Sequence, residues 1–154
     1  MSQPSRIAVN KTYLPPLEKF KAYIDQIWAS GHLTNHGPFL AQLEDRLKDT
    51  LGVDYFYFLT NGTVALQMAL RGLDLTKGDI ITTPYSYVAT TSAIMWERGH
   101  PVFVDVDPQT FCIDPQSIED AITPRTRAIM AVHVYGNACD VESIEDIAHR
   151  HNLK

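Results

Sequence analysis

Residues 58–66, FLTNGTVAL, carry the strongest chemical pattern, because an expected strand passes through a short turn directly into an expected helix. The first N–H groups of a helix lack acceptors within it, and the positive end of the helix dipole attracts anions. Gly62 would let a phosphate approach the backbone, and the hydroxyls of Thr60 and Thr63 could donate further hydrogen bonds. Neither the Walker pattern nor GxGxxG is present, so those nucleotide sites are not indicated. The alternative is a plain helix cap by Thr60 or Asn61.

Aromatic and imidazole side chains follow two later expected strands. Tyr85 and Tyr87 lie in residues 84–90, just past a strand end, and ligands of open α/β sheets bind beyond such ends. A tyrosine ring at this place could stack on a planar heteroaromatic cofactor. His133, after another strand, could take part in acid–base chemistry or hydrogen-bond a cofactor substituent. The alternatives are tyrosines that pack a loop and a buried histidine with satisfied nitrogens.

The remaining candidate groups indicate structure rather than chemistry. Asp105 and Asp107 precede Pro108 and are interpreted as turn residues, not as a carboxylate pair. Cys112 and Cys139 are too few for a disulfide framework or a metal cluster. We interpret them as small, partly buried packing residues, which fits a reducing cytoplasm. No HExxH, GxSxG or Cys/His metal spacing occurs, so no metal site is expected.

These side chains need regular elements to position them. Hydrophobic spacing and turn residues predict helices over residues 17–30, 38–51, 64–70, 88–98, 116–122 and 141–151, and strands over residues 55–59, 79–83, 101–106 and 127–134. Gly31 and Gly52 are expected to end the first two helices, and Asp114 and Asp140 to begin the last two. From residue 55 onward strands and helices alternate, and the strands are apolar along their length. We therefore expect an α/β fold with a mainly parallel sheet flanked by helices.

The composition is that of an ordinary globular chain of about one domain. Its 154 residues are 45% apolar and 20% charged, with a net charge of −5, which argues against disorder, a collagen-like fibre or a coiled coil. No basic block offsets the negative charge, so a nucleic-acid partner is not expected. The apolar runs are shorter than the roughly 18–20 residues of a membrane span, and residues 1–11 contain no stretch typical of a secretion signal.

Several segments, taken in order, resemble the N-terminal part of the DegT/DnrJ/EryC1/StrS nucleotide-sugar aminotransferases. The similar segments are GHLTN at 31–35, GP at 37–38, LE at 43–44, TNGTVAL at 60–66, PYSYVAT at 84–90, VDVD at 104–107, IDP at 113–115 and HVYGN at 133–137, with Asp140. The resemblance implies the large domain of a fold-type I enzyme that uses pyridoxal 5′-phosphate (PLP). Residues 1–37 would form an N-terminal helix and active-site loop, and residues 38–154 an incomplete PLP-binding domain.

The resemblance also implies roles for individual residues. Gly62 and Thr63 would hold the cofactor phosphate through main-chain N–H groups, and Tyr87 would stack on the pyridine ring. Thr34 and Asn35 would lie near the sugar-nucleotide site. The implied reaction moves an amino group, usually from glutamate, to a keto group of a nucleotide-linked deoxysugar. The local sequence is most similar to members that act at C4 of a dTDP-4-keto-6-deoxyhexose for surface polysaccharide, and such enzymes form homodimers.

The lysine that binds PLP covalently in this family is expected beyond residue 154, after a serine in an SxxK-like motif. No catalytic residue is therefore assigned within this chain, because none of its lysines stands in that context. These lysines are Lys11, Lys19, Lys21, Lys48, Lys77 and Lys154. We expect the chain to be part of a protein more than twice as long, to be inactive alone, and to expose apolar edges that promote self-association.

Two other functions stay open. A non-catalytic relative would bind PLP or a sugar nucleotide without turnover, as a regulator or partner subunit. A dehydratase of the same family would carry a histidine in place of the lysine. The sequence after residue 154 would decide between these functions and the aminotransferase.

Overall fold

The computed structural model describes residues 10–154, which fall into two compact units divided after Phe58. The second unit spans Leu59–Lys154. The boundary after Phe58 separates two groups of residues that contact mainly members of their own group. The division expected after Gly37 rests on a different basis, because it separates an active-site loop from the PLP-binding domain that follows it. The first nine residues of the expected N-terminal region, and most of the stretch considered for a secretion signal, lie outside the described residues.

The first unit contains two helices, each ended by a glycine. Helix α1 spans Leu17–Ser30 and helix α2 spans Pro38–Leu51. Gly31 (φ 63°) and Gly52 (φ 66°) adopt the left-handed conformation, and each donates its N–H to a carbonyl of the last helical turn. The two helices and their glycine ends are therefore confirmed.

The second unit builds a small parallel sheet. Its elements are α3 (Gly62–Gly72), β1 (Asp79–Thr82), α4 (Ala89–Trp96), β2 (His100–Phe103), α5 (Pro115–Asp120), β3 (Thr126–Ile129), the 3-10 turn η1 (Val134–Gly136) and α6 (Val141–Arg150). The strand order is β2-β1-β3, and β1 runs parallel to both neighbours. The expected α/β class with a parallel sheet is confirmed.

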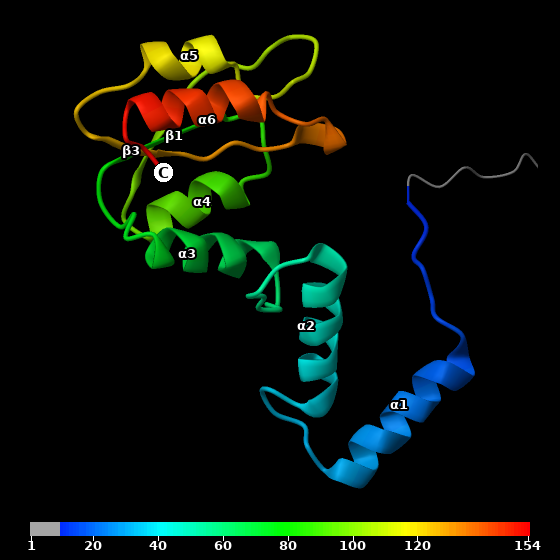
Figure 1. Ribbon diagram of the computed structural model, residues 1–154. Coiled ribbons are helices and arrows are strands. Elements are labelled where there is room, and N and C mark those ends of the chain that lie inside the picture. Colours follow the sequence, from blue (N-terminus) through cyan, green and yellow to red (C-terminus); the bar gives the residue numbers. More distant parts are fainter. Residues whose placement is uncertain (1–9) are drawn as a thin grey trace, which may run out of the picture. The chain divides into compact units, whose positions relative to one another are not determined.

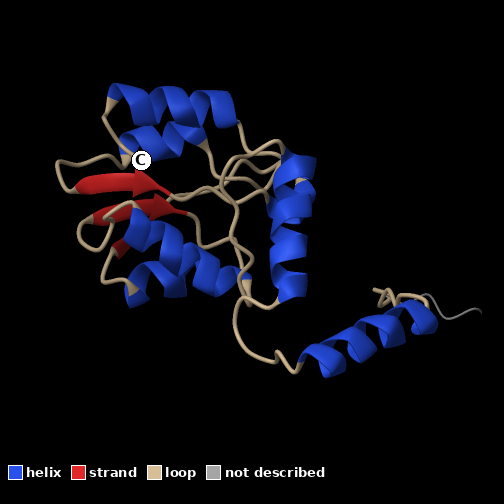
Figure 2. Cartoon of the chain, turned by 60° about the horizontal axis from the view of Figure 1, so that its bottom comes forward, coloured by secondary structure: helices blue, strands red, loops and turns tan. Residues whose placement is uncertain are grey.

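Helices cover both faces of this sheet, with α3 and α4 on one side and α5 and α6 on the other (Figures 1 and 2). Consecutive residues of a strand point to opposite faces. Ile80 packs with Ala93 in the core beneath α3 and α4, while Ile81 packs with Ile118 and Ile147 in the core beneath α5 and α6. Both faces of β1 are thus buried, which explains why its sequence is apolar without alternation.

The strand expected over residues 55–59 is wrong. This segment is irregular, and Tyr55 and Tyr57 are exposed. A strand requires a neighbour for its ladder of hydrogen bonds, and none of residues 10–154 pairs with this segment. One contact fixes its end, because the Phe58 N–H donates to the Glu44 carboxylate at 2.9 Å.

The last two strands are shorter than the apolar runs that predict them. β2 ends at Phe103 because the chain turns after it, and Val106 forms an antiparallel bridge with Ile113 instead of extending the sheet. β3 ends at Ile129, and Val134 begins η1. The apolar residues beyond both strands serve the core without joining the ladder.

Side-chain caps begin the last two helices, as expected. Asp114 accepts the N–H groups of Gln116 and Ser117 at the start of α5. Asp140 accepts both the hydroxyl and the N–H of Ser143 at the start of α6, and these bonds hold the pKa of the Asp140 carboxyl below its usual value. Among the helices of residues 10–154, none combines the length and the apolar character needed to cross a membrane.

Helix α1 exposes a stripe of apolar side chains to solvent. None of its residues is buried, and Phe20 and Trp28 are exposed. We expect the chain to self-associate, since burying two such rings gains about 3 kcal/mol or more. Replacing both residues with serine should weaken the association at least about tenfold in sedimentation equilibrium.

The matched control is Lys19→Ser, which changes an exposed polar residue of the same helix. It should leave the association constant unchanged. A wild-type chain that sediments as a monomer across the accessible concentration range would contradict the prediction.

Candidate functional site

The N-terminus of α3 offers two unused backbone donors. Asn61 caps the helix, because its side-chain oxygen accepts the Val64 N–H at 3.0 Å, and its carbonyl accepts the Ala65 N–H at 3.3 Å. The N–H groups of Gly62 and Thr63 find no acceptor among the described residues. The helix cap considered as an alternative is therefore real, and it still leaves the two expected donors available.

These donors fit a phosphate group. The helix behind them has 11 residues, so its dipole adds positive potential where the N–H groups converge. Nothing lies within 4 Å of the position that a Cβ atom on Gly62 would take. An oxyanion could therefore approach the backbone at Gly62 without displacing a neighbouring side chain.

The C-terminal ends of α3 and α4 lie close together, as an ion pair between their last turns shows. Arg71 Nε lies 2.8 Å from Glu97 Oε2, and both residues stand at the C-terminal ends of their helices. The two helices also pack side by side, and because their C-terminal ends meet they run in the same direction (Figure 1). Since α4 follows β1, its start and Tyr87 lie beyond the carboxyl end of that strand, as does the start of α3.

A cavity of about 420 Å³ lies beside Tyr87 at this edge. It is lined by the segments that follow β1 and β3, namely Pro84, Tyr85, Ser86, Tyr87, Val132, His133, Val134 and Tyr135. Tyr87 is 80% exposed, whereas Tyr85 stacks on Phe111 with ring centroids 5.6 Å apart. The alternative that the tyrosines pack a loop therefore holds for Tyr85, whereas the exposed Tyr87 ring is available to a ligand.

The imidazole of His133 forms part of the same wall in a defined tautomer. Its Nδ1 accepts the Cys139 N–H at 3.0 Å. A ring nitrogen that accepts an N–H carries no proton, so the neutral ring carries its proton on Nε2. The side chain is exposed, so the alternative of a buried histidine is wrong. One nitrogen is satisfied internally, and the other can donate to a ligand.

The two cysteines pack in the core and the two aspartates stabilise a turn, as expected from the sequence. Cys112 and Cys139 are buried free thiols, and burial, with the nearby Cys112, raises the pKa of Cys139 to about 11. Such a thiol is not a nucleophile at neutral pH. Asp105 and Asp107 accept N–H groups of their own turn, and the Thr110 and Gln109 N–H groups lower the pKa of Asp107. Across residues 10–154, no cluster of metal-ligating side chains forms.

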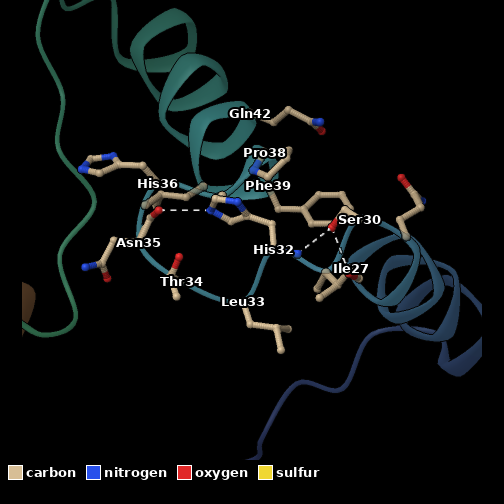
Figure 3. Close-up of a pocket in the computed structure, with 13 residues that line it drawn as sticks. Ile27, Ser30, His32, Leu33, Thr34, Asn35, His36, Pro38, Phe39 and Gln42 are labelled. Carbon is tan, nitrogen blue, oxygen red and sulfur yellow. Dashed lines mark hydrogen bonds between the residues drawn. The ribbon is translucent and has the colours of Figure 1, made fainter.

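Thr34 and Asn35 lie in the first unit, in the wall of a cavity of about 630 Å³ between the end of α1 and the start of α2 (Figure 3). The loop closes on itself, because His32 Nε2 lies 3.2 Å from the Asn35 carbonyl oxygen. Gln26 and Gln42 add amide groups from the two helices. Neither glutamine was predicted from the sequence. Each lies about one helical turn from the end of its helix that adjoins the loop, and this spacing could have indicated that they face the same cavity.

The fold and the site define a parallel α/β protein covered on both faces, with loops and a helix start gathered at the carboxyl edge of the sheet. Sequence comparison then places it: residues 17–154 match the profile described as the DegT/DnrJ/EryC1/StrS aminotransferase family. The chain belongs to this family, and the resemblance noted from its motifs is confirmed.

Two similar relatives are both named dTDP-4-amino-4,6-dideoxy-D-glucose transaminase. The protein from Shigella dysenteriae is 51% identical over 148 residues, which are 96% of this chain and 40% of the relative. The protein from Escherichia coli is 47% identical over 148 residues, with the same shares of 96% and 40%. The chain therefore spans about 40% of the length of these relatives.

Solved structures share the fold. DesI in the presence of its TDP-sugar product aligns with a TM-score of 0.83 at 31% identity, covering 90% of this chain and 35% of DesI. NtdA from Bacillus subtilis with bound cofactor PMP aligns with a TM-score of 0.81 at 36% identity, covering 99% of this chain and 37% of NtdA. The expected fold, part of a PLP-dependent aminotransferase domain, is confirmed.

Proposed function

We propose that this chain supplies the phosphate- and ring-binding part of a PLP-dependent aminotransferase that acts on a nucleotide-linked deoxysugar. The observation that carries the proposal is the pair of unused N–H donors at Gly62 and Thr63, at the same edge of the sheet as the exposed Tyr87 ring. A dianion and a flat heterocycle in one molecule, as in PLP, match these two features.

The chain's own residues bind and orient in this proposal. The N–H groups of Gly62 and Thr63 hold the phosphate, while the Tyr87 ring covers one face of the pyridine. His133 Nε2–H is free to donate to a polar substituent of the ring, because the Cys139 N–H occupies Nδ1. PLP supplies the electron sink for amino transfer when bound, and the protein supplies positioning.

We further propose that the acceptor is the C4 keto group of a dTDP-4-keto-6-deoxyhexose, with glutamate as amino donor, in the synthesis of a surface-polysaccharide sugar. The names of the two relatives at 51% and 47% identity support this choice. Thr34 and Asn35 would contact the sugar nucleotide from the wall of the cavity between α1 and α2. We also propose that this aminotransferase is a homodimer and works in the cytoplasm.

The chain alone is expected to bind cofactor without completing a transamination. No lysine lies among the residues that line either the cavity beside Tyr87 or the cavity of the first unit. A covalent PLP–lysine bond at these cavities would need a residue from outside them. The same observation supports the second candidate function, a binding module that holds the cofactor or a sugar nucleotide without turnover.

Binding is tested with pyridoxamine 5′-phosphate, which has no aldehyde to react with surface lysines, and with pyridoxamine as a control that lacks the phosphate. We expect the chain to bind the phosphorylated ligand at least about tenfold more tightly in fluorescence titrations, since charge-assisted hydrogen bonds are about twice as strong as neutral ones. Equal affinities would contradict the assignment of the phosphate site.

The reaction is tested with PLP, glutamate and either a 4-keto or a 3-keto dTDP-deoxysugar, with the product position assigned by NMR. We expect the protein from the complete gene to aminate the 4-keto sugar and the 154-residue chain to yield no product. Amination of the 3-keto sugar alone would overturn the C4 assignment, and product from the chain alone would overturn its expected inactivity.

A further inference from the structure

Each of the three loops that follow the sheet strands contributes one aromatic ring to a cluster. Tyr85 follows β1, Phe111 lies between β2 and α5, and Tyr135 follows β3. Tyr85 stacks on Phe111 at 5.6 Å, and Tyr135 meets Tyr85 edge-on at 6.3 Å and Phe111 edge-on at 6.4 Å. Such offset and edge-to-face pairs are favourable arrangements of aromatic rings, so the three loops are held to one another by side chains.

A hydrogen bond between two phenol groups completes the cluster, since the Tyr85 and Tyr135 hydroxyl oxygens lie 3.1 Å apart. The backbone of two of these loops is strained, since Phe111 (φ 61°) and Tyr135 (φ 55°) adopt the left-handed conformation that bulky residues avoid. A neighbouring bond, from the Asn137 side-chain amide to the Thr110 carbonyl, fixes the same loops at 3.1 Å. Strain persists only where surrounding contacts enforce it.

The linked tyrosines stand directly beside the residues assigned to the cofactor ring. Tyr87 is two residues after Tyr85, and His133 is two residues before Tyr135, and all four side chains line the same cavity. We propose that the Tyr85–Tyr135 hydroxyl pair is a tether that holds Tyr87 and His133 at a fixed spacing across the cofactor cavity. The part of this inference that concerns the cofactor rests on the proposed function.

The tether acts through position and not through proton transfer. Each hydroxyl is engaged with the other, and the hydrogen bond to Tyr135 raises the pKa of the Tyr85 phenol above its usual value. The Tyr85 phenol therefore keeps its proton at physiological pH. We class Tyr85 and Tyr135 as positioning residues, which bear on the cofactor through the loops that carry Tyr87 and His133.

The test uses Tyr85→Phe, Tyr135→Phe and the double variant, which keep the rings and remove only the hydroxyls. Tyr55→Phe is the matched control, because Tyr55 is exposed and lies in the first unit. Hydrogen exchange in the unliganded chain should rise about two- to tenfold in both loops, residues 84–88 and 132–139, when either hydroxyl is lost. The control should change neither loop.

Titration with pyridoxamine 5′-phosphate supplies the second readout. Each single variant should bind about two- to tenfold more weakly, and the double variant no more weakly than either single one, because one bond is lost in all three. The induced circular dichroism of the bound ligand should shift alike in the three variants.

The outcomes separate the tether from the proposed function. If hydrogen exchange in both loops is unchanged in the Tyr85→Phe and Tyr135→Phe variants, the tether is wrong, whatever the ligand affinities are. The tether is also wrong if the affinity loss of the double variant equals the product of the two single losses. If the wild-type chain takes up no pyridoxamine 5′-phosphate but exchange rises as expected, the proposed function fails and the tether between the loops stands.

Discussion

Replacing Gly62 with aspartate should abolish binding of pyridoxamine 5′-phosphate and leave the chain at least as stable as before. Gly62 is the first residue of α3, and a side chain there meets nothing within 4 Å. A carboxylate at a helix N-terminus stabilises the helix by about 0.3–1 kcal/mol. The same charge repels a phosphate dianion by about 3 kcal/mol or more at this range, which is over a hundredfold in affinity.

Two controls identify charge as the cause. Gly62→Asn has nearly the same shape without the charge and should lose much less affinity, and pyridoxamine, which lacks the phosphate, should bind the aspartate variant about as well as the wild-type chain. Thermal melting checks that stability is retained. If Gly62→Asp binds the phosphorylated ligand normally, the phosphate does not lie at the start of α3, and the central assignment is wrong.

Ile81→Ala should destabilise the second unit by about 3 kcal/mol, within the 2–5 kcal/mol typical of such truncations in a core. Ile81 has no exposed surface and stands on the central strand, where it packs against residues of α5 and α6. The loss is a large share of the roughly 5–15 kcal/mol that stabilises a native domain. Urea unfolding measures it as a lower midpoint with an unchanged slope.

The graded control is Ile81→Val, which removes one methylene and should cost about 1 kcal/mol. Ile80→Ala tests the opposite face, since Ile80 is equally buried against α3 and α4. Both alanine variants should cost similar amounts because β1 contributes to both cores. A loss below about 1 kcal/mol for Ile81→Ala would show that the core beneath α5 and α6 is not packed as described.

The elements were predictable where local chemistry decides them. Gly31 and Gly52 end their helices and Asp114 and Asp140 cap theirs, because each feature depends on residues within one turn. Strand lengths depend on partners that are distant in sequence. Residues 55–59 have strand-forming side chains but no neighbour among the described residues, so propensity alone gave the wrong answer there.

The site was predictable in its motifs and not in its geometry. The turn before α3 and the tyrosine after β1 stand out in the sequence, and the structure brings them to one edge of the sheet. Phe111 gave no such pattern, because its role depends on a left-handed backbone and on rings from two other loops. The assignments of Gly62, Thr63, Tyr87, Thr34 and Asn35 to ligands stay predictions until binding is measured.

The strand order has a consequence for where a ligand can bind. The chain steps from β1 to β2 on one side and then crosses to β3 on the other, so its winding direction reverses. Because crossovers between parallel strands are right-handed, α4 and α5 fall on opposite faces, and a crevice opens between β1 and β3 at this switch point. The cavity lined by residues 84–87 and 132–135 occupies that crevice. Topology thus sets the location of the pocket, and we expect a substitution of Tyr87, which lines its wall, to change the ligands that it accepts while leaving the pocket in place.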